Sequence, residues 1–204
     1  MWLFEIYLSI ALSGFCGRKN AEKYIEDGKV TVNAQRVSLG DHCYPTDTIK
    51  VGQTLIKVPE EEFTYIVMNK PKGIITSKKD EEGRKKVIDI IKPKDRLSNL
   101  FPVGRLDYNT SGLLIITNDG PFAQSIIHPS NKKTKTYKIS LNKPLDYGDK
   151  NKLEKGIELD GYLLSSCKIN PLNKKFYEVI LQEGKNRQIR RMFREFGYVV
   201  ISIH

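Results

Sequence analysis

Residues 104–120 have the sequence GRLDYNTSGLLIITNDG, in which a loop of small and charged residues leads directly into an apolar strand. Gly104 and Gly112 allow backbone angles that other residues avoid, so they can hold Arg105 and Asp107 outward from the loop. Reactive side chains are often placed on loops that a rigid strand supports. An aspartate in such a loop is also a common turn cap, so these residues alone leave catalysis and capping both open for Asp107.

The segments on either side of this stretch mix strands and helices. Strand patterns occur at 65–68, 74–76, 113–117, 135–141, 162–169, 176–182 and 198–203, and helix patterns at 121–127, 147–155 and 186–196. Pro121 suits the first position of its helix. Because these segments do not alternate as βαβ units, the sequence predicts an α+β fold with a mixed or antiparallel sheet.

The beginning of the chain forms a separate pattern. Helices are expected over about 3–12 and 18–26, and short strands at 29–33, 35–37, 48–51 and 54–58. A proline and three glutamates at 59–62 then interrupt the strand pattern. We therefore predict a first domain over 1–58, a linker over 59–62 and a second domain over 63–204.

The composition favours a polyanionic partner. The chain of 204 residues has 34 Lys and Arg against 24 Asp and Glu, a formal charge of +10. Such a balance indicates nucleic acid first and an anionic membrane second, although a basic surface without a specific partner also fits the charge alone.

The cysteines indicate a reducing cytoplasm, and the apolar segments indicate neither a secretory signal nor a membrane span. Cys16, Cys43 and Cys167 lie far apart without the spacing of a zinc site or a disulfide framework. The apolar start contains Glu5 and has no basic region before it, so we expect a buried helix there and no secretory signal. No stretch approaches the ~20 apolar residues of a membrane span.

A second group of charged residues lies at 182–194, where a strand end and a glycine precede a helix rich in arginine. Helix N-termini and guanidinium groups both favour phosphate or carboxylate. At helical spacing its four arginines, Arg187, Arg190, Arg191 and Arg194, cannot share one face, so some can meet a substrate while others face solvent. A solvated basic helix is the competing interpretation.

Tyr137 lies among lysines in an alternating strand. A phenol can stack on a nucleobase and can also handle a proton, although core packing explains such a residue equally well. In the first region, a basic edge that suits contacts with an RNA backbone is formed by Arg18, Lys19, Lys23 and Lys29.

Residues 104–114 resemble the catalytic-aspartate motif of the bacterial ribosomal RNA pseudouridine synthases of the RsuA-like family. Further segments similar to that family are 65–73, 135–138 and 183–192. Residues 14–25 and 28–33 resemble the S4-type RNA-binding domain that precedes the synthase in these proteins. The matched segments cover nearly the whole chain in the order of the family.

The resemblance implies that the protein isomerises a uridine of ribosomal RNA to pseudouridine, without metal or cofactor. Asp107 would be the nucleophile and Tyr137 the ring that packs on the target base and assists proton movement. Arg190 would pair with Asp107 and favour its ionised form. The target base must be turned out of the folded RNA, at a cost of roughly a few kcal/mol. Contacts with the RNA are expected from Arg105, Lys185, Arg187, Arg191, Arg18, Lys19, Lys23 and Lys29.

Some positions depart from the family pattern. Gly17 replaces a serine, Ala34 replaces a glycine, and Leu8 and Leu12 stand where basic residues are frequent, which weakens the expected RNA binding. The chain stops at His204 where family members continue through a further basic segment, so a natural short form and a truncated one both stay open.

Two other functions compete with the synthase. One is an S4-type RNA-binding protein that has lost turnover. The other is a carboxylate glycosidase, which needs a second acidic group, and Asp119 is the nearest candidate. A monomer is the default expectation for each of them.

Overall fold

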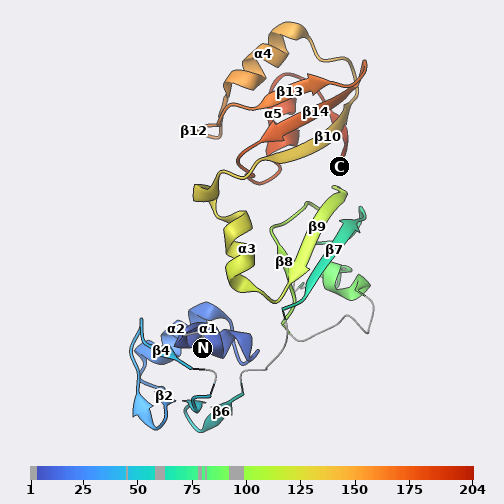
Figure 1. The fold of residues 1–204 in the computed structure, drawn as a ribbon. Helices are drawn as coiled ribbons and strands as arrows, with labels where there is room; N and C mark the ends of the chain where they lie inside the picture. Colours follow the sequence, from blue (N-terminus) through green and yellow to red (C-terminus); the bar gives the residue numbers. More distant parts are fainter. Residues whose placement is uncertain (1–3, 45, 58–62, 78–79, 81, 92–98) are drawn as a thin grey trace. The chain divides into compact units, whose positions relative to one another are not determined.

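The computed structural model describes residues 4–44, 46–57, 63–77, 80, 82–91 and 99–204 (Figure 1). Backbone contacts divide the chain into two compact units. Unit 1 comprises Met1–Phe63 with Leu97–Leu100, and unit 2 comprises Thr64–Arg96 with Phe101–His204. The predicted linker at 59–62 lies outside the described residues.

Unit 1 is a pair of helices with a small antiparallel sheet. The helices are α1 (Ile6–Leu12) and α2 (Arg18–Glu26). The sheet has the order β3-β2-β5-β6 and consists of β2 (Val30–Val32), β3 (Gln35–Arg36), β5 (Ile49–Val51) and β6 (Thr54–Ile56). A separate two-stranded pair joins β1 (Phe4–Glu5) to β4 (His42–Cys43). The inward side chains of both helices pack on the sheet in one apolar cluster.

The predicted helix at 18–26 is confirmed, and the first helix is shorter than predicted. Phe4 and Glu5 pair with β4 as a strand, so α1 begins only at Ile6. The strand β4 was not predicted because two residues are too few to show an alternating pattern.

Unit 2 contains two larger antiparallel sheets. The first has the order β7-β9-β8 and consists of β7 (Tyr65–Lys70), β8 (Phe101–Val103) and β9 (Gly112–Thr117). The second has the order β13-β14-β10-β15 and consists of β10 (Lys135–Leu141), β13 (Lys168–Pro171), β14 (Phe176–Leu181) and β15 (Val200–Ile203). The remaining elements are α3 (Gly120–Ile127), α4 (Tyr147–Lys155), α5 (Gln188–Glu195), the hairpin of β11 (Glu158–Leu159) and β12 (Tyr162–Leu163), and the short 3-10 helices η1 (Val87–Ile90) and η3 (Pro129–Asn131).

The second sheet and α5 enclose the main core of unit 2. Ile189, Met192 and Phe193 form the buried stripe of α5, and they pack in one cluster with Ile139 and Val179 of the sheet. Figure 1 shows α5 against β14 and β10. The basic start of α5 is thereby fixed relative to the strand that carries Tyr137.

Several elements of unit 2 differ from the predictions. Helix α3 begins at Gly120 because Asp119 is its N-cap and accepts a hydrogen bond from Phe122 N at 2.9 Å, so Pro121 is one residue later than predicted. Strand β8 was missed because Pro102 argues against a strand, and the sheet accepts it only at an edge. The strand expected at 74–76 is reduced to one bridge between Ile75 and Lys86.

Candidate active site

The loop between β8 and β9 carries Asp107. Gly104 has a φ of +81° and Gly112 a φ of +140°, so both glycines adopt the backbone conformations that the sequence suggested. A Cβ atom on Gly112 would lie 3.5 Å from the backbone carbon of His204. The end of the loop therefore lies directly against the end of β15.

The ammonium of Lys70 binds backbone carbonyls in the middle of this loop. Its side chain is 0% exposed at the end of β7, and its ammonium donates to Pro71 O at 3.0 Å, Asp107 O at 3.1 Å and Thr110 O at 2.9 Å. Burial lowers the pKa of Lys70, and the negative charge of Asp107 acts in the opposite direction. All three donors of the ammonium are thus used to fix backbone.

Other segments of unit 2 bind the rest of the loop. Leu106 O accepts from Thr76 Oγ1 at 2.8 Å, and Tyr108 O accepts from Gly73 N at 2.9 Å. Further bonds join Arg190 Nη2 to Asn109 O at 3.0 Å and Ser111 N to Ile203 O at 3.2 Å. Nearly every residue of the loop is therefore held through its backbone.

The backbone of Asp107 is hydrogen-bonded, but its carboxylate is not. Asp107 is half-buried, and its carboxylate forms no hydrogen bond or ion pair with any residue in the described parts of the chain. A charged group that the protein positions without pairing is available to a ligand.

Tyr137 and Arg190 lie within the electrostatic reach of Asp107. Burial raises the pKa of the Tyr137 phenol, and the charge of Asp107 raises it further. Burial and the charge of Arg187 lower the pKa of Arg190, whereas Asp107 raises it. The charge of Asp107 thus acts on Tyr137 of β10 and on Arg190 of α5, the two residues predicted to share its site.

Arg190 reaches the loop through backbone atoms. Its Nη1 donates to Val200 O at 2.8 Å and its Nη2 to Asn109 O. Its Nε is buried without a hydrogen-bond partner among the described residues. No ion pair between described residues joins Arg190 to Asp107, so their interaction acts over a longer distance than a salt bridge.

Of the other residues of unit 2 predicted to contact RNA, two are exposed and two contact other side chains of the protein. Arg105 and Arg187 are exposed. Arg191 forms an ion pair with Asp160 and donates to Asn186 O, so much of its guanidinium is used within the protein. Lys185 Nζ lies 5.0 Å from the ring centre of Tyr162, within the range of a cation–π contact.

The basic residues predicted for the first domain belong to unit 1. Arg18, Lys19 and Lys23 are exposed on α2. Lys29 pairs with Asp27 at 3.0 Å and lies 5.8 Å from the ring centre of Tyr24. Three of the four residues are therefore exposed without an ion pair to any described residue.

Lys70 was not among the residues predicted from the sequence. Positions 66, 68 and 70 share one face of β7, since side chains alternate along a strand, and that face is the more buried one. The sequence pattern that could have identified Lys70 is a lysine at an inward-facing position of a strand, directly before a proline.

Asp119 is engaged in structure. It is 8% exposed, caps α3 and accepts a hydrogen bond from Tyr65 OH at 2.6 Å. This carboxylate therefore does not serve as the second free acid that a glycosidase needs. Within the described residues, no three His, Cys, Asp or Glu side chains gather as a metal site, and no described helix is long and apolar enough to cross a bilayer.

The family model for RNA pseudouridylate synthase matches residues 64–195, which include the Asp107 loop, Tyr137 and Arg190. The chain belongs to the RNA pseudouridylate synthase family. The predicted resemblance is thereby confirmed at the level of this family.

Curated relatives of this chain are found in Bacillus subtilis and in Escherichia coli. Ribosomal large subunit pseudouridine synthase B of Bacillus subtilis (strain 168) is 40% identical over 201 residues, which are 95% of this chain and 81% of that protein. Dual-specificity RNA pseudouridine synthase RluF of Escherichia coli (strain K12) is 35% identical over 192 residues, 94% of this chain but only 65% of that protein.

The fold has a similar solved structure, described as a crystal structure of pseudouridylate synthase. The two superpose with a TM-score of 0.68 at 27% sequence identity, over 98% of this chain and 86% of that one. The combination of helices and antiparallel sheets seen in this chain is therefore that of a known relative.

Proposed function

We propose that the protein isomerises a uridine of ribosomal RNA to pseudouridine, with Asp107 as the nucleophile. One observation carries the proposal. Several elements bind the backbone of the loop, but the Asp107 carboxylate has no partner among the described residues. Its charge acts on Tyr137 and Arg190. Family membership supports the reaction, and the name of the Bacillus subtilis relative supports ribosomal RNA as the substrate.

The reaction exchanges one glycosidic bond for another. The bond from the ribose C1′ to N1 of the base breaks, and a bond from C1′ to C5 forms. The proton on C5 leaves and N1 gains a proton, so the product is an isomer of the substrate. In this scheme the Asp107 carboxylate attacks the sugar or the base, holds the fragment covalently and then departs. No electron donor or acceptor is required.

Tyr137 and Arg190 have separate parts in this scheme. The Tyr137 phenol is neutral near pH 7, since its pKa is raised from 10.0, so its hydroxyl can donate a hydrogen bond or pass a proton while the ring stacks on the base. Arg190 is held by two carbonyls and supplies positive charge near the carboxylate of Asp107. We assign Arg105, Lys185, Arg187 and Arg191 to the surrounding RNA.

We further propose that unit 1 is an S4-type RNA-binding domain, with the boundary at 58 and the linker at 59–62. The exposed basic residues of α2 would meet the RNA backbone, a contact that depends on salt but not on sequence. We propose a monomer that acts in the cytoplasm, where free cysteines such as Cys16 and Cys43 stay reduced.

The experiment incubates purified protein with unmodified ribosomal RNA and maps pseudouridine. We expect the wild type to convert uridine and D107N to make no product, with RNA binding retained. D119N is the matched control, since asparagine caps a helix as well as aspartate and this variant should stay active. Full activity of D107N would refute the assignment of Asp107 as the nucleophile. RNA binding by the wild type without conversion would instead favour the RNA-binding alternative.

A further inference from the structure

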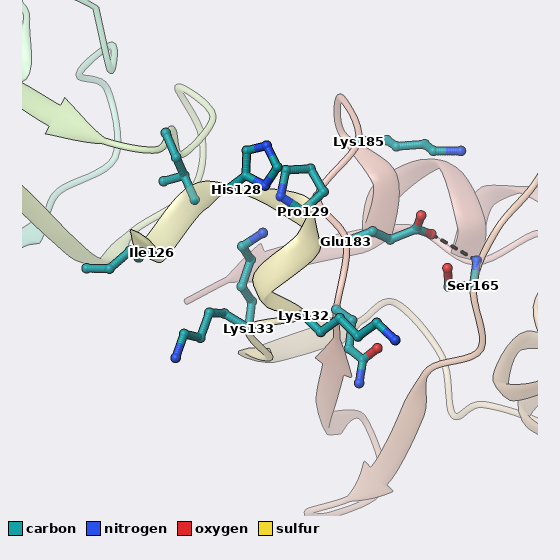
Figure 2. A pocket seen from close by; sticks show the side chains of 12 residues that line it. Ile126, His128, Pro129, Lys132, Lys133, Ser165, Glu183 and Lys185 are labelled. Atoms are coloured by element: carbon teal, nitrogen blue, oxygen red, sulfur yellow. Dashed lines mark hydrogen bonds between the residues drawn. The ribbon is translucent and has the colours of Figure 1, made fainter. Parts of the chain in front are cut away.

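A cavity of about 560 Å³ lies in unit 2 between the end of α3 and the loop that follows β14. Its walls come from residues 126–129 and 182–185, from Ser165, and from Lys132, Lys133 and Lys135. Figure 2 shows His128 and Pro129 at the turn after α3, with Glu183 and Lys185 on the loop beyond them. Of its lining residues, only Lys185 has a part in the proposed function so far.

The cavity is strongly basic. Lys132, Lys133, Lys135 and Lys185 line it, and we call it the lysine cavity. None of these lysines forms an ion pair with a described residue. Gathering unpaired like charges around one hollow opposes folding through mutual repulsion, and it attracts an anion to that place.

Glu183, the carboxylate among the lining residues, is used to shape the loop. Its Oε1 accepts from Gln188 Nε2 at 2.7 Å and from Ser165 N at 3.1 Å, the bond drawn in Figure 2. Gln188 Oε1 in turn accepts from Lys185 N at 2.9 Å. The acidic residue thus fixes the backbone that carries Lys185 and forms no ion pair with the four lysines.

The lysine cavity is connected to the candidate active site by one strand face. Positions 135, 137, 139 and 141 share a face of β10, along which Ile139 and Leu141 are buried, Tyr137 is half-buried and Lys135 is exposed. Two residues along a strand span roughly 7 Å. Lys135, which lines the cavity, is therefore the next residue after Tyr137 on this face.

The backbone beside the cavity has an unusual conformation. Lys132 ends η3 with a φ of +44°, in the left-handed region that lysine rarely occupies. Such conformations are retained where the surrounding structure needs a side chain in one direction, often at ligand-binding positions.

We propose that the lysine cavity binds a phosphodiester group of the RNA strand next to the target uridine. Lysine binds phosphate as a mobile point charge, which suits a backbone group whose exact position varies between RNA sequences. The inference rests on the proposed function for the identity of the ligand. It adds Lys132, Lys133 and Lys135 to the residues that bind the RNA.

The test compares K132A/K133A with K174A/K175A. Both variants remove two adjacent exposed lysines of unit 2, but Lys174 and Lys175 lie at the opposite end of β14 from the cavity. Binding of a single-stranded oligouridylate and of unmodified ribosomal RNA is measured against salt concentration. For K132A/K133A we expect several-fold weaker binding and a salt slope smaller by about 0.7 for each phosphate that is no longer neutralised, with the single-turnover rate at saturating RNA unchanged.

The outcomes separate this inference from the proposed function. Equal affinity and salt slope in the two variants would overturn the lysine cavity as a phosphate site, even with a wild type that converts uridine. A wild type that makes no pseudouridine, combined with a reduced slope in K132A/K133A alone, would refute the proposed function and retain the phosphate site. A fall in the saturated rate of K132A/K133A would also contradict a role limited to binding.

Discussion

Lys70 and the lysines of the lysine cavity show two opposite uses of the same side chain. Lys70 is fully buried, and its three donors all bind carbonyls of the chain. Lys132 and Lys133 are exposed and have no ion-pair partner among the described residues. A charge that the protein satisfies internally positions other groups, whereas a charge left unsatisfied at a hollow is available to a ligand.

The largest expected effect on stability comes from replacing Lys70. K70M keeps most of the volume but leaves the carbonyls of Pro71, Asp107 and Thr110 without their donor, at a cost of about 3 kcal/mol in the free energy of unfolding. Turnover should fall as well, because Asp107 O is then no longer held by the ammonium.

Urea unfolding of K70M and of K72M measures the difference. Lys72 is exposed two residues further along the chain, so K72M should stay within about 0.5 kcal/mol of the wild type. Equal stability of the two variants would mean that the bonds of Lys70 do not support the loop.

Arg190, like Lys70, binds carbonyls of the chain, and replacing it should give a smaller effect. R190K keeps the positive charge, but a single ammonium cannot reproduce the forked geometry that joins Val200 O to Asn109 O. We expect the single-turnover rate to fall by about tenfold, or 1.4 kcal/mol in the activation barrier, with RNA affinity nearly unchanged. R194K, an exposed arginine of the same helix, is the control. A rate for R190K equal to that of R194K would show that charge alone is sufficient at position 190.

Local patterns in the sequence predicted many elements well. The bounds of α2, β10 and α4 agree with the prediction residue by residue, because each has a clear period and a defined start or end. β4, β8 and η1 were missed, since they are short or contain a proline, and long-range pairing decides whether they form.

The candidate site was predictable only in part. The family resemblance selected Asp107, Tyr137 and Arg190, but the bonds that hold the loop join residues from 30 to 92 positions apart. The support from Lys70 and Thr76, and the gathering of the lysines at one cavity, depend on tertiary packing that no local period encodes.

A shared site for Asp107, Tyr137 and Arg190 is the physical basis of the proposed chemistry. The Tyr137 phenol offers a direct measure of it, because burial and the charge of Asp107 raise its pKa from 10.0. The folded state therefore keeps this proton more tightly than the unfolded chain, and the stabilising contribution is present below pH 10 and is lost as the pH rises through the folded pKa.

The decisive measurement is the titration of Tyr137 by NMR of tyrosine-labelled protein, in the wild type and in D107N, with Y137F to assign the signal. The pKa of Tyr137 should lie above 10.0 in the wild type and should decrease in D107N, while remaining raised because burial is unchanged. An identical Tyr137 pKa in the two proteins would contradict a common site for the carboxylate and the phenol.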